Sequence, residues 1–347
     1  MRYTPPLPMR STQDSNATAA RLVRTLAPPL FIAAGLAAYA NVLDNYFLSD
    51  DFAQIGRVLT GDLSVVWGRE HGGFFRPVFI LSYVSDAALW GRQSFGFHLT
   101  NVLLHALNSF FVLLLARRLF DGEGVADGRR DAAALAAGLL FLLHPSHTEA
   151  VSWISGRADV LATFFGLLSL LFQLPRARAR RRAALALSLL CFALALFAKE
   201  AAAFIPLAAL LLGARDGAAR GARRALSAGA KHAAPFVLVL AAYVFTRAAA
   251  LGSLVGGYGA EHHLNFTHSM IVSQLLRFPL RALFPALALR HATFLESRLL
   301  SPVLIITGAL VVVLAALVLS RARARKSLAA FVRRVRVPRV RTKCVLE

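Results

Sequence analysis

Apolar runs that approach the length of a membrane crossing recur along the whole chain. Hydrophobic residues make up 57% of the 347 residues, and the mean hydropathy is +0.58, whereas an average soluble domain is roughly 45–50% apolar. A helix needs about 20 mostly apolar residues to cross a bilayer. The candidate crossing segments are 26–43, 97–119, 131–143, 160–174, 183–198, 201–213, 233–251 and 302–320. These runs predict an all-α fold, a polytopic integral membrane bundle of about eight transmembrane helices.

Basic residues gather on alternate connections and therefore predict the orientation of the helices, because Lys and Arg accumulate on the cytoplasmic side of membrane proteins. With a cytoplasmic N-terminus and eight crossings, the inside segments contain 28 of the 39 basic residues and 7 of the 18 acidic ones. The inside segments are 1–24, 117–131, 176–182, 214–232 and 321–347. We therefore expect both termini in the cytoplasm.

A formal net charge of +21 would suggest nucleic-acid binding in a soluble protein. Here the basic runs, such as residues 176–182, flank apolar segments and lack interleaved aromatic residues. Orientation and contact with anionic lipid account for this charge. We expect the lipid bilayer, and no nucleic acid, as a partner.

The composition divides the chain into three regions. Residues 1–24 are polar and are expected to form a disordered cytoplasmic N-terminus, residues 25–320 the transmembrane domain, and residues 321–347 a basic, low-complexity cytoplasmic tail. Between residues 45 and 95 lies a long loop on the opposite side of the membrane. Residues 63–69 and 76–90 in this loop are expected to form interfacial helices, since the second contains Ser82, Ser85 and Asp86 on an apolar background.

Two adjacent carboxylates, Asp50 and Asp51, follow the first apolar run. Ionisable residues kept beside membrane crossings are candidates for function. Repulsion between adjacent carboxylates can raise one pKa and leave the other group as an ionised base, an arrangement suited to deprotonating a hydroxyl group. The alternative is an N-cap pair that starts a short helix at Phe52.

A second polar cluster connects the third and fourth runs, where Pro145 is expected to end a helix and Ser146 or Thr148 to cap the next one. Arg157 could bind a phosphate through its bidentate fork, with Asp159 as its orienting partner. The alternative is an internal salt bridge that fixes the helical hairpin. The stretch also brings together His144, His147 and Glu149, which could bind a divalent metal, although the set lacks a third well-spaced ligand motif.

A third charged pair, Lys199 and Glu200, marks the outer junction of the fifth and sixth runs. Lys199 could neutralise a lipid phosphate, and Arg76 lies on the same side of the membrane and could join it. The alternative for Lys199 is a side chain that extends to the interface to keep its charge hydrated.

Six motifs occur in an order that resembles one family. They are SDD (49–51), FRP (75–77), FHLTNVLLH (97–105), HPSHTEAV (144–151), SGRAD (155–159) and AKE (198–200). This set is similar to the membrane half of the transmembrane-and-tetratricopeptide-repeat O-mannosyltransferases and their bacterial relatives, within the GT-C glycosyltransferases. The resemblance extends from about residue 45 to residue 213.

The resemblance implies an inverting transfer of a sugar from a polyprenyl-phosphate donor to an acceptor hydroxyl at the periplasmic face of a bacterial inner membrane. It implies Asp50 or Asp51 as the general base and no metal cofactor. Cations at Arg157, Lys199 and Arg76 are the candidates for holding the donor phosphate. His147, Glu149, Asp159 and Glu200 are the candidates for orienting those cations or the acceptor.

The chain departs from this family in two ways. It has no 34-residue helical repeat and no motif of the type Glu-Arg-x-Leu-Tyr-Leu-Pro after the apolar runs. A truncated, non-catalytic relative is therefore one alternative. A transporter is the other, although transporters place ionisable residues near the middle of the membrane, whereas these charges gather at helix ends.

Overall fold

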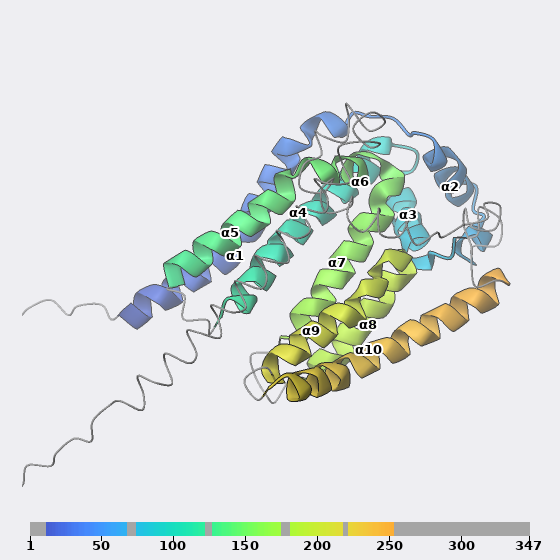
Figure 1. Cartoon of the computed structure of the whole chain (residues 1–347). Helices are drawn as coiled ribbons and strands as arrows, with labels where there is room; N and C mark the ends of the chain where they lie inside the picture. Colours follow the sequence, from blue (N-terminus) through green and yellow to red (C-terminus); the bar gives the residue numbers. More distant parts are fainter. Residues whose placement is uncertain (1–11, 68–73, 122–126, 175–180, 218–220, 253–347) are drawn as a thin grey trace, which may run out of the picture. The chain divides into compact units, whose positions relative to one another are not determined.

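The computed structural model describes residues 12–67, 74–121, 127–174, 181–217 and 221–252. Helices make up its regular structure, and no β-strand occurs in these ranges, as the sequence predicts (Figure 1). The α-helices are α1 (Thr12–Ala38), α2 (Asp50–Leu59), α3 (Pro77–Trp90), α4 (Ser94–Leu119), α5 (Asp127–Leu143), α6 (Thr148–Ser152), α7 (Arg157–Phe172), α8 (Arg181–Ala198), α9 (Ile205–Gly217) and α10 (Ala222–Leu251). Short 3₁₀ turns lie between them: η1 (Ala40–Val42), η2 (Leu63–Trp67), η3 (Pro145–His147), η4 (Ile154–Gly156) and η6 (Glu200–Phe204).

Four of the described helices are long and apolar enough to cross a membrane. They are Ser94–Leu119, Ile154–Phe172, Arg181–Ala198 and Ala222–Leu251. The apolar part of α1, Thr25–Ala38, and helix α3 are shorter. The predicted segment 302–320 and the tail 321–347 lie outside the described residues, so the expected number of eight crossings stays a prediction.

The N-terminal region is helical earlier than the sequence suggested. Helix α1 begins at Thr12, within the segment 1–24 for which disorder was expected, and residues 1–11 lie outside the described ranges. The polar composition of this stretch did not reveal that it continues into the apolar helix that follows.

Helices α9 and α10 approach each other closely at two glycines. A Cβ atom on Gly213 would lie 2.5 Å from the Cβ of His232, and one on Gly229 would lie 2.6 Å from the carbonyl oxygen of Leu210. Small residues let helix backbones approach in a membrane, where van der Waals packing replaces the hydrophobic effect. This contact holds α10 against the rest of the described helices.

The first long loop folds onto the ends of the helices. Helix α2 packs against α3, and α3 packs against α4 and α8. Ile55 and Val58 of α2 are buried with Phe79 and Tyr83 of α3. Burying aliphatic side chains of this size stabilises a protein by roughly 1.5–3 kcal/mol each, which is enough to fix α2 in one place.

The two interfacial helices expected in this loop are present in part. Residues 63–67 form only the short turn η2, while α3 begins at Pro77 as predicted. The sequence predicted that residues 76–90 form an interfacial helix partly because Asp86 would face water. This reason is wrong. Asp86 is buried and points toward a cation inside the bundle, as described below.

Candidate functional site

The connection from α5 to α7 consists of three short turns at one end of the helices. Helix α5 ends at Leu143, before Pro145, as the sequence predicts. The predicted caps are wrong, since neither Ser146 nor Thr148 caps α6. Helix α6 follows His147 and has no side-chain cap, whereas the ring of His144 caps the preceding turn η3 by accepting a hydrogen bond from the backbone N–H of Ser146. A Cβ on Gly156 would lie 2.6 Å from the carbonyl oxygen of Ala150, so this tight connection requires glycine.

The two adjacent aspartates point in opposite directions. Asp50 is exposed in the first turn of α2, whereas Asp51 is 1% exposed. One oxygen of Asp51 accepts hydrogen bonds from the backbone N–H (2.8 Å) and the hydroxyl (2.5 Å) of Ser155. The other oxygen accepts one from the N–H of Leu48 (2.9 Å). Helix α2 begins at Asp50 itself, and the residue before it is Ser49, so the alternative of a helix beginning at Phe52 is wrong.

A strained backbone turn separates the two carboxylates from the preceding loop. Ser49 has φ 52°, and within the described ranges it is the one residue other than glycine with a positive φ. Such a conformation costs about 1–3 kcal/mol and persists only where its surroundings enforce it. Asp51 accepts hydrogen bonds from Leu48, before this turn, and from Ser155 across the site.

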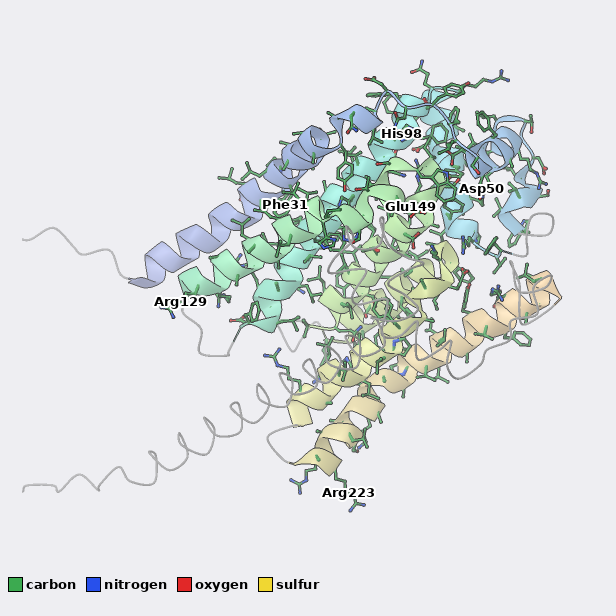
Figure 2. All side chains as sticks on the ribbon, turned by 45° about the horizontal axis from the view of Figure 1, so that its top comes forward. Phe31, Asp50, His98, Arg129, Glu149 and Arg223 are labelled. Atoms are coloured by element: carbon green, nitrogen blue, oxygen red, sulfur yellow. The ribbon has the colours of Figure 1, made fainter. Side chains whose placement is uncertain are left out.

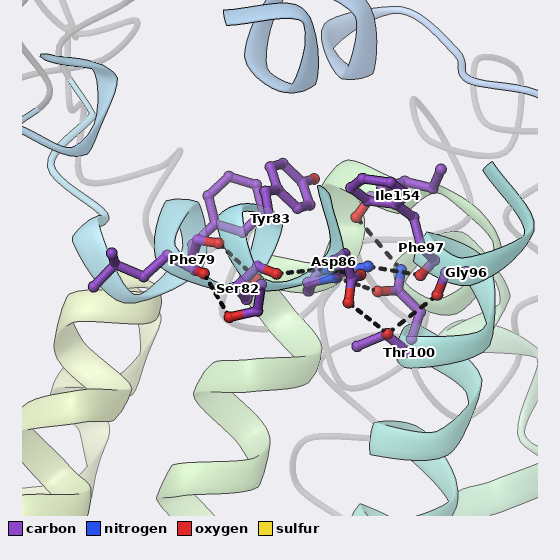
Figure 3. Close-up of polar contacts among 12 residues, drawn as sticks. Phe79, Ser82, Tyr83, Asp86, Gly96, Phe97, Thr100 and Ile154 are labelled. Atoms are coloured by element: carbon purple, nitrogen blue, oxygen red, sulfur yellow. Dashed lines mark hydrogen bonds and ion pairs between the residues drawn. The ribbon is translucent and has the colours of Figure 1, made fainter. Parts of the chain in front are cut away.

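Arg157 lies in the interior of the bundle and not on a surface that a donor could reach. Its side chain is fully buried and forms an ion pair with Asp86 of α3, with 2.6 Å between Nη1 and Oδ2. It also donates to the side chain of Asn101 (2.7 Å) and to the carbonyl oxygen of Phe97 (2.6 Å), both on α4 (Figure 3). The predicted role of Arg157 in holding the donor phosphate does not fit this burial, and its ion-pair partner is Asp86, not Asp159.

The Arg157 network joins α3, α4 and the α5–α7 connection. Thr100 donates to the second oxygen of Asp86 at 2.9 Å (Figure 3). The side-chain amide of Asn101 donates to the carbonyl oxygens of Trp153 (3.1 Å) and Ile154 (3.4 Å). A buried network of hydrogen bonds and an ion pair rigidifies a core. It therefore fixes η4, the turn that contains the Ser155 partner of Asp51.

Two other cations form ion pairs at the C-terminal end of α8. Lys199 Nζ lies 2.7 Å from a carboxylate oxygen of Asp159, in the first turn of α7. Arg76 donates two hydrogen bonds to Glu200, at 3.0 Å and 2.7 Å. In both pairs the carboxylate is more exposed than the cation, with 47% against 27% for the first pair and 40% against 18% for the second. These side chains lie where a ligand at this end could reach them.

Burial and neighbouring cations shift the pKa of Glu200 in opposite directions. Burial alone would raise the pKa of this carboxyl group, but the hydrogen bonds and charge of Arg76, together with the charge of Arg247, hold the pKa below its usual range. Arg247 is on α10 and was not singled out from the sequence. After Arg76, it is the second basic side chain in the surroundings of Glu200.

The histidines of the α5–α7 connection pack as aromatic rings. His147 lies against Phe141, with 4.4 Å between ring centroids, and against His105 at 5.3 Å. Burial, and then the nearby charge of His144, lower the pKa of His147. Glu149 is exposed. In the part of the chain that the structure describes, no group of three His, Cys, Asp or Glu side chains is placed to bind a metal ion.

A chain of contacts brings most of the predicted residues to one end of the helices. Asp51 bonds to Ser155, which lies one helical turn before Asp159, and Asp159 is paired to Lys199 beside Glu200. In Figure 2, Asp50 and Glu149 lie at this end together with His98, whereas Arg129 and Arg223 lie at the opposite end. The structure thus places Asp50, Asp51, Asp159, Lys199, Glu200 and Arg76 at one end of the helices but keeps Arg157 inside the bundle.

The sequence did not reveal two partners in this site, Asp86 for Arg157 and Ser155 for Asp51. Asp86 was interpreted as facing the interface, and Ser155 was noted only as part of a motif. A single acidic residue on an otherwise apolar helix was the available signal for Asp86, since such residues are costly unless they are paired.

Part of the chain is similar to known protein O-mannosyl-transferases. Tmtc1 of Drosophila melanogaster is 32% identical over 181 residues, which are 47% of this chain and 20% of the relative. TMTC2 of Homo sapiens is 36% identical over 170 residues (43% and 18%). TMTC4 of Homo sapiens is 40% identical over 103 residues (28% and 14%).

These matches confirm the resemblance that the six motifs predict. The chain spans about a fifth or less of the length of these relatives. No family model matches the chain, and no solved structure matches it.

Proposed function

We propose that this protein is an integral-membrane glycosyltransferase that moves a sugar from a polyprenyl-phosphate donor to an acceptor hydroxyl, with inversion at the anomeric carbon. The observation that carries this proposal is the exposed carboxylate of Asp50, held at the same end of the bundle as the cations Lys199 and Arg76. The similarity to protein O-mannosyl-transferases supports the reaction class.

Asp50 is the proposed general base. It accepts the proton of the acceptor hydroxyl while the hydroxyl oxygen attacks the anomeric carbon of the donor sugar. The bond between that carbon and the phosphate oxygen breaks, and the lipid phosphate leaves with the bonding electron pair. Asp51 is buried and fully engaged by Ser155 and Leu48, so we assign the base to Asp50 and not to Asp51.

Lys199 and Arg76 are the proposed ligands of the donor phosphate. Cations placed where negative charge develops stabilise the departing phosphate. Their present partners, Asp159 and Glu200, orient them through ion pairs at 2.7 Å. Exposed Glu149 and the half-buried His147 beside it are proposed to contact the acceptor.

We further propose the orientation that the basic residues predict, with this site at the periplasmic face of a bacterial inner membrane. The opposite end carries Arg129 and Arg223, in agreement with the preference of basic residues for the cytoplasmic side. The proposed reaction uses no metal cofactor. Turnover in the presence of EDTA tests that part separately.

The test is the release of free polyprenyl phosphate by the full chain in nanodiscs, with mannose or glucose donors and a panel of hydroxyl acceptors. Wild type is compared with Asp50→Asn, which removes the base but retains the shape of an exposed side chain. Release by wild type only, at a rate at least a hundredfold above Asp50→Asn, is the expected result, since a positioned base contributes about 10²–10⁴-fold. Equal release by both proteins would remove Asp50 as the base, and absence of release with every donor would favour a non-catalytic relative.

A further inference from the structure

We infer that Ser155 is a positioning residue that holds Asp50 in place through the buried carboxylate of Asp51. The inference rests on the proposed function for its catalytic consequence. The contact between Ser155 and Asp51 does not depend on that function. It joins η4 to the start of α2, two elements that are far apart in the sequence.

The geometry begins at the turn before α2. Ser49 has φ 52° and ψ −117°, a conformation that L residues rarely adopt. It turns the chain so that Asp50 remains exposed while Asp51 enters the bundle. A strained turn of this kind relaxes unless other contacts hold it.

Three hydrogen bonds to one carboxylate hold the turn. Asp51 accepts from the N–H of Leu48 before the strained residue and from the N–H and hydroxyl of Ser155 across the site. The indole of Trp153 adds a fourth contact by donating to the carbonyl oxygen of Leu48 at 3.3 Å. The loop on one side of Ser49 and the helix on the other are thus both attached to the η4 region.

The attachment point is itself rigid. Ser155 is buried, and Tyr83 of α3 donates to its hydroxyl at 3.4 Å. Two residues later comes Arg157, whose guanidinium binds groups of α3 and α4. Asp51 and Ser155 therefore connect the backbone at Asp50 to the interior of the bundle.

A role in positioning predicts a loss of rate with little loss of donor affinity. Asp50 does not bind the donor phosphate in the proposed reaction, so its displacement lowers kcat and leaves the KM for the donor within about twofold. A misplacement of about 1 Å costs on the order of 10²-fold in rate. Ser155→Ala removes the hydroxyl but keeps the backbone N–H, and we expect kcat to fall about 10–100-fold.

The experiment compares wild type, Ser155→Ala and Ser188→Ala in nanodiscs. Ser188 is a matched control because it is also a buried serine, and its hydroxyl donates across helices to the carbonyl oxygen of Ser169 at 2.8 Å. Two quantities are measured: kcat and KM for release of polyprenyl phosphate, and backbone hydrogen exchange of peptides that cover residues 45–59. The inference predicts a lower kcat and faster exchange at 45–59 in Ser155→Ala only.

An unchanged kcat in Ser155→Ala beside an active wild type would overturn the inference. An equal loss of kcat in Ser188→Ala would also overturn it, since loss of stability would then be the cause. If wild type shows no turnover, the proposed function fails, and hydrogen exchange alone decides. Faster exchange at 45–59 in Ser155→Ala would support the tether, and unchanged exchange would reject it.

A double variant tests the role of the strained turn. Glycine adopts positive φ at no steric cost, so Ser49→Gly reduces the need for the tether. We expect kcat of Ser49→Gly/Ser155→Ala to exceed that of Ser155→Ala alone. A double variant that is no faster would remove the link between Ser155 and the turn at Ser49.

Discussion

Arg157 and Asp86 form an ion pair with 2.6 Å between nitrogen and oxygen, and their side chains are 0% and 5% exposed. Moving two charges out of water is costly, and the attraction between them compensates only when the remaining hydrogen-bonding groups are satisfied as well. Here Asn101, Thr100 and the carbonyl oxygen of Phe97 provide those bonds. The pair therefore joins α3 to α7, and its hydrogen bonds extend to α4.

Removal of either member of this pair is expected to destabilise the protein strongly. Asp86→Leu leaves a buried guanidinium without its counter-charge, and Arg157→Met leaves a buried carboxylate without its own, each of which costs about 3–5 kcal/mol. The double variant Asp86→Leu/Arg157→Met removes both charges and is expected to cost less than either single change. The measurement is the free energy of unfolding in detergent for the four proteins of this double-mutant cycle.

A conservative variant, Arg157→Lys, distinguishes a structural role of Arg157 from donor binding. A folded Arg157→Lys protein is expected to lose stability while its KM for the donor stays unchanged. An increase in donor KM at unchanged stability would restore Arg157 as a ligand of the donor phosphate.

Lys199 and Arg76 are expected to affect donor affinity instead. Lys199→Gln removes a charge at the proposed phosphate site, and Arg76→Lys keeps the charge but loses the bidentate fork. Each is expected to raise the donor KM about tenfold, because a hydrogen bond to a charged group contributes about 1.5–3 kcal/mol. Arg130→Lys is the control, since Arg130 is ion-paired to Asp127 beside the start of α5. A similar increase in KM in Arg130→Lys would show that the effect is not specific to the site.

Local features of the fold could be predicted from the sequence. Pro145 ends α5, Pro77 begins α3, and the apolar runs form helices, because backbone geometry and the cost of exposing polar groups to lipid act over a few residues. The end of the bundle at which the charged residues gather also followed from the motifs. These inferences need no knowledge of contacts between distant residues.

The directions of individual side chains could not be predicted. Whether Asp50 or Asp51 faces inward depends on the backbone of Ser49 and on Ser155, a partner 104 residues away. The direction of Asp86 could not be predicted either, because an acidic side chain on an apolar helix can face water or pair with a buried cation. Arg157 was interpreted as a phosphate ligand since its motif lies beside other charges, while its partners lie on α3 and α4.

The close contact between α9 and α10 predicts sensitivity to side-chain size at Gly229. A Cβ there would lie 2.6 Å from the carbonyl oxygen of Leu210, so Gly229→Val forces the helices apart. Overpacking of this kind costs about 1–3 kcal/mol, measured as a lower free energy of unfolding. Gly128→Ala on α5 is the control, because a Cβ at Gly128 meets nothing within 4 Å, and we expect no loss of stability in this variant. Equal stability of wild type and Gly229→Val would contradict the packing of α10.

The ion pair between Arg76 and Glu200 predicts a loss of stability in acid. Burial alone would raise the pKa of Glu200. Arg76, and then Arg247, lower this pKa by more than burial raises it, so the folded value lies below the usual one. A lowered carboxyl pKa stabilises the folded state above the unfolded pKa of about 4.3, and this stabilisation disappears as the pH falls through the folded value. Glu200 is 40% exposed, so we expect a contribution of about 1 kcal/mol or less. The measurement is the difference in free energy of unfolding between wild type and Glu200→Gln from pH 6.5 down to about pH 3. Wild type is expected to be the more stable protein at pH 6.5 and to lose that advantage on acidification, whereas a difference that stays constant with pH would show that the charge of Glu200 is not responsible.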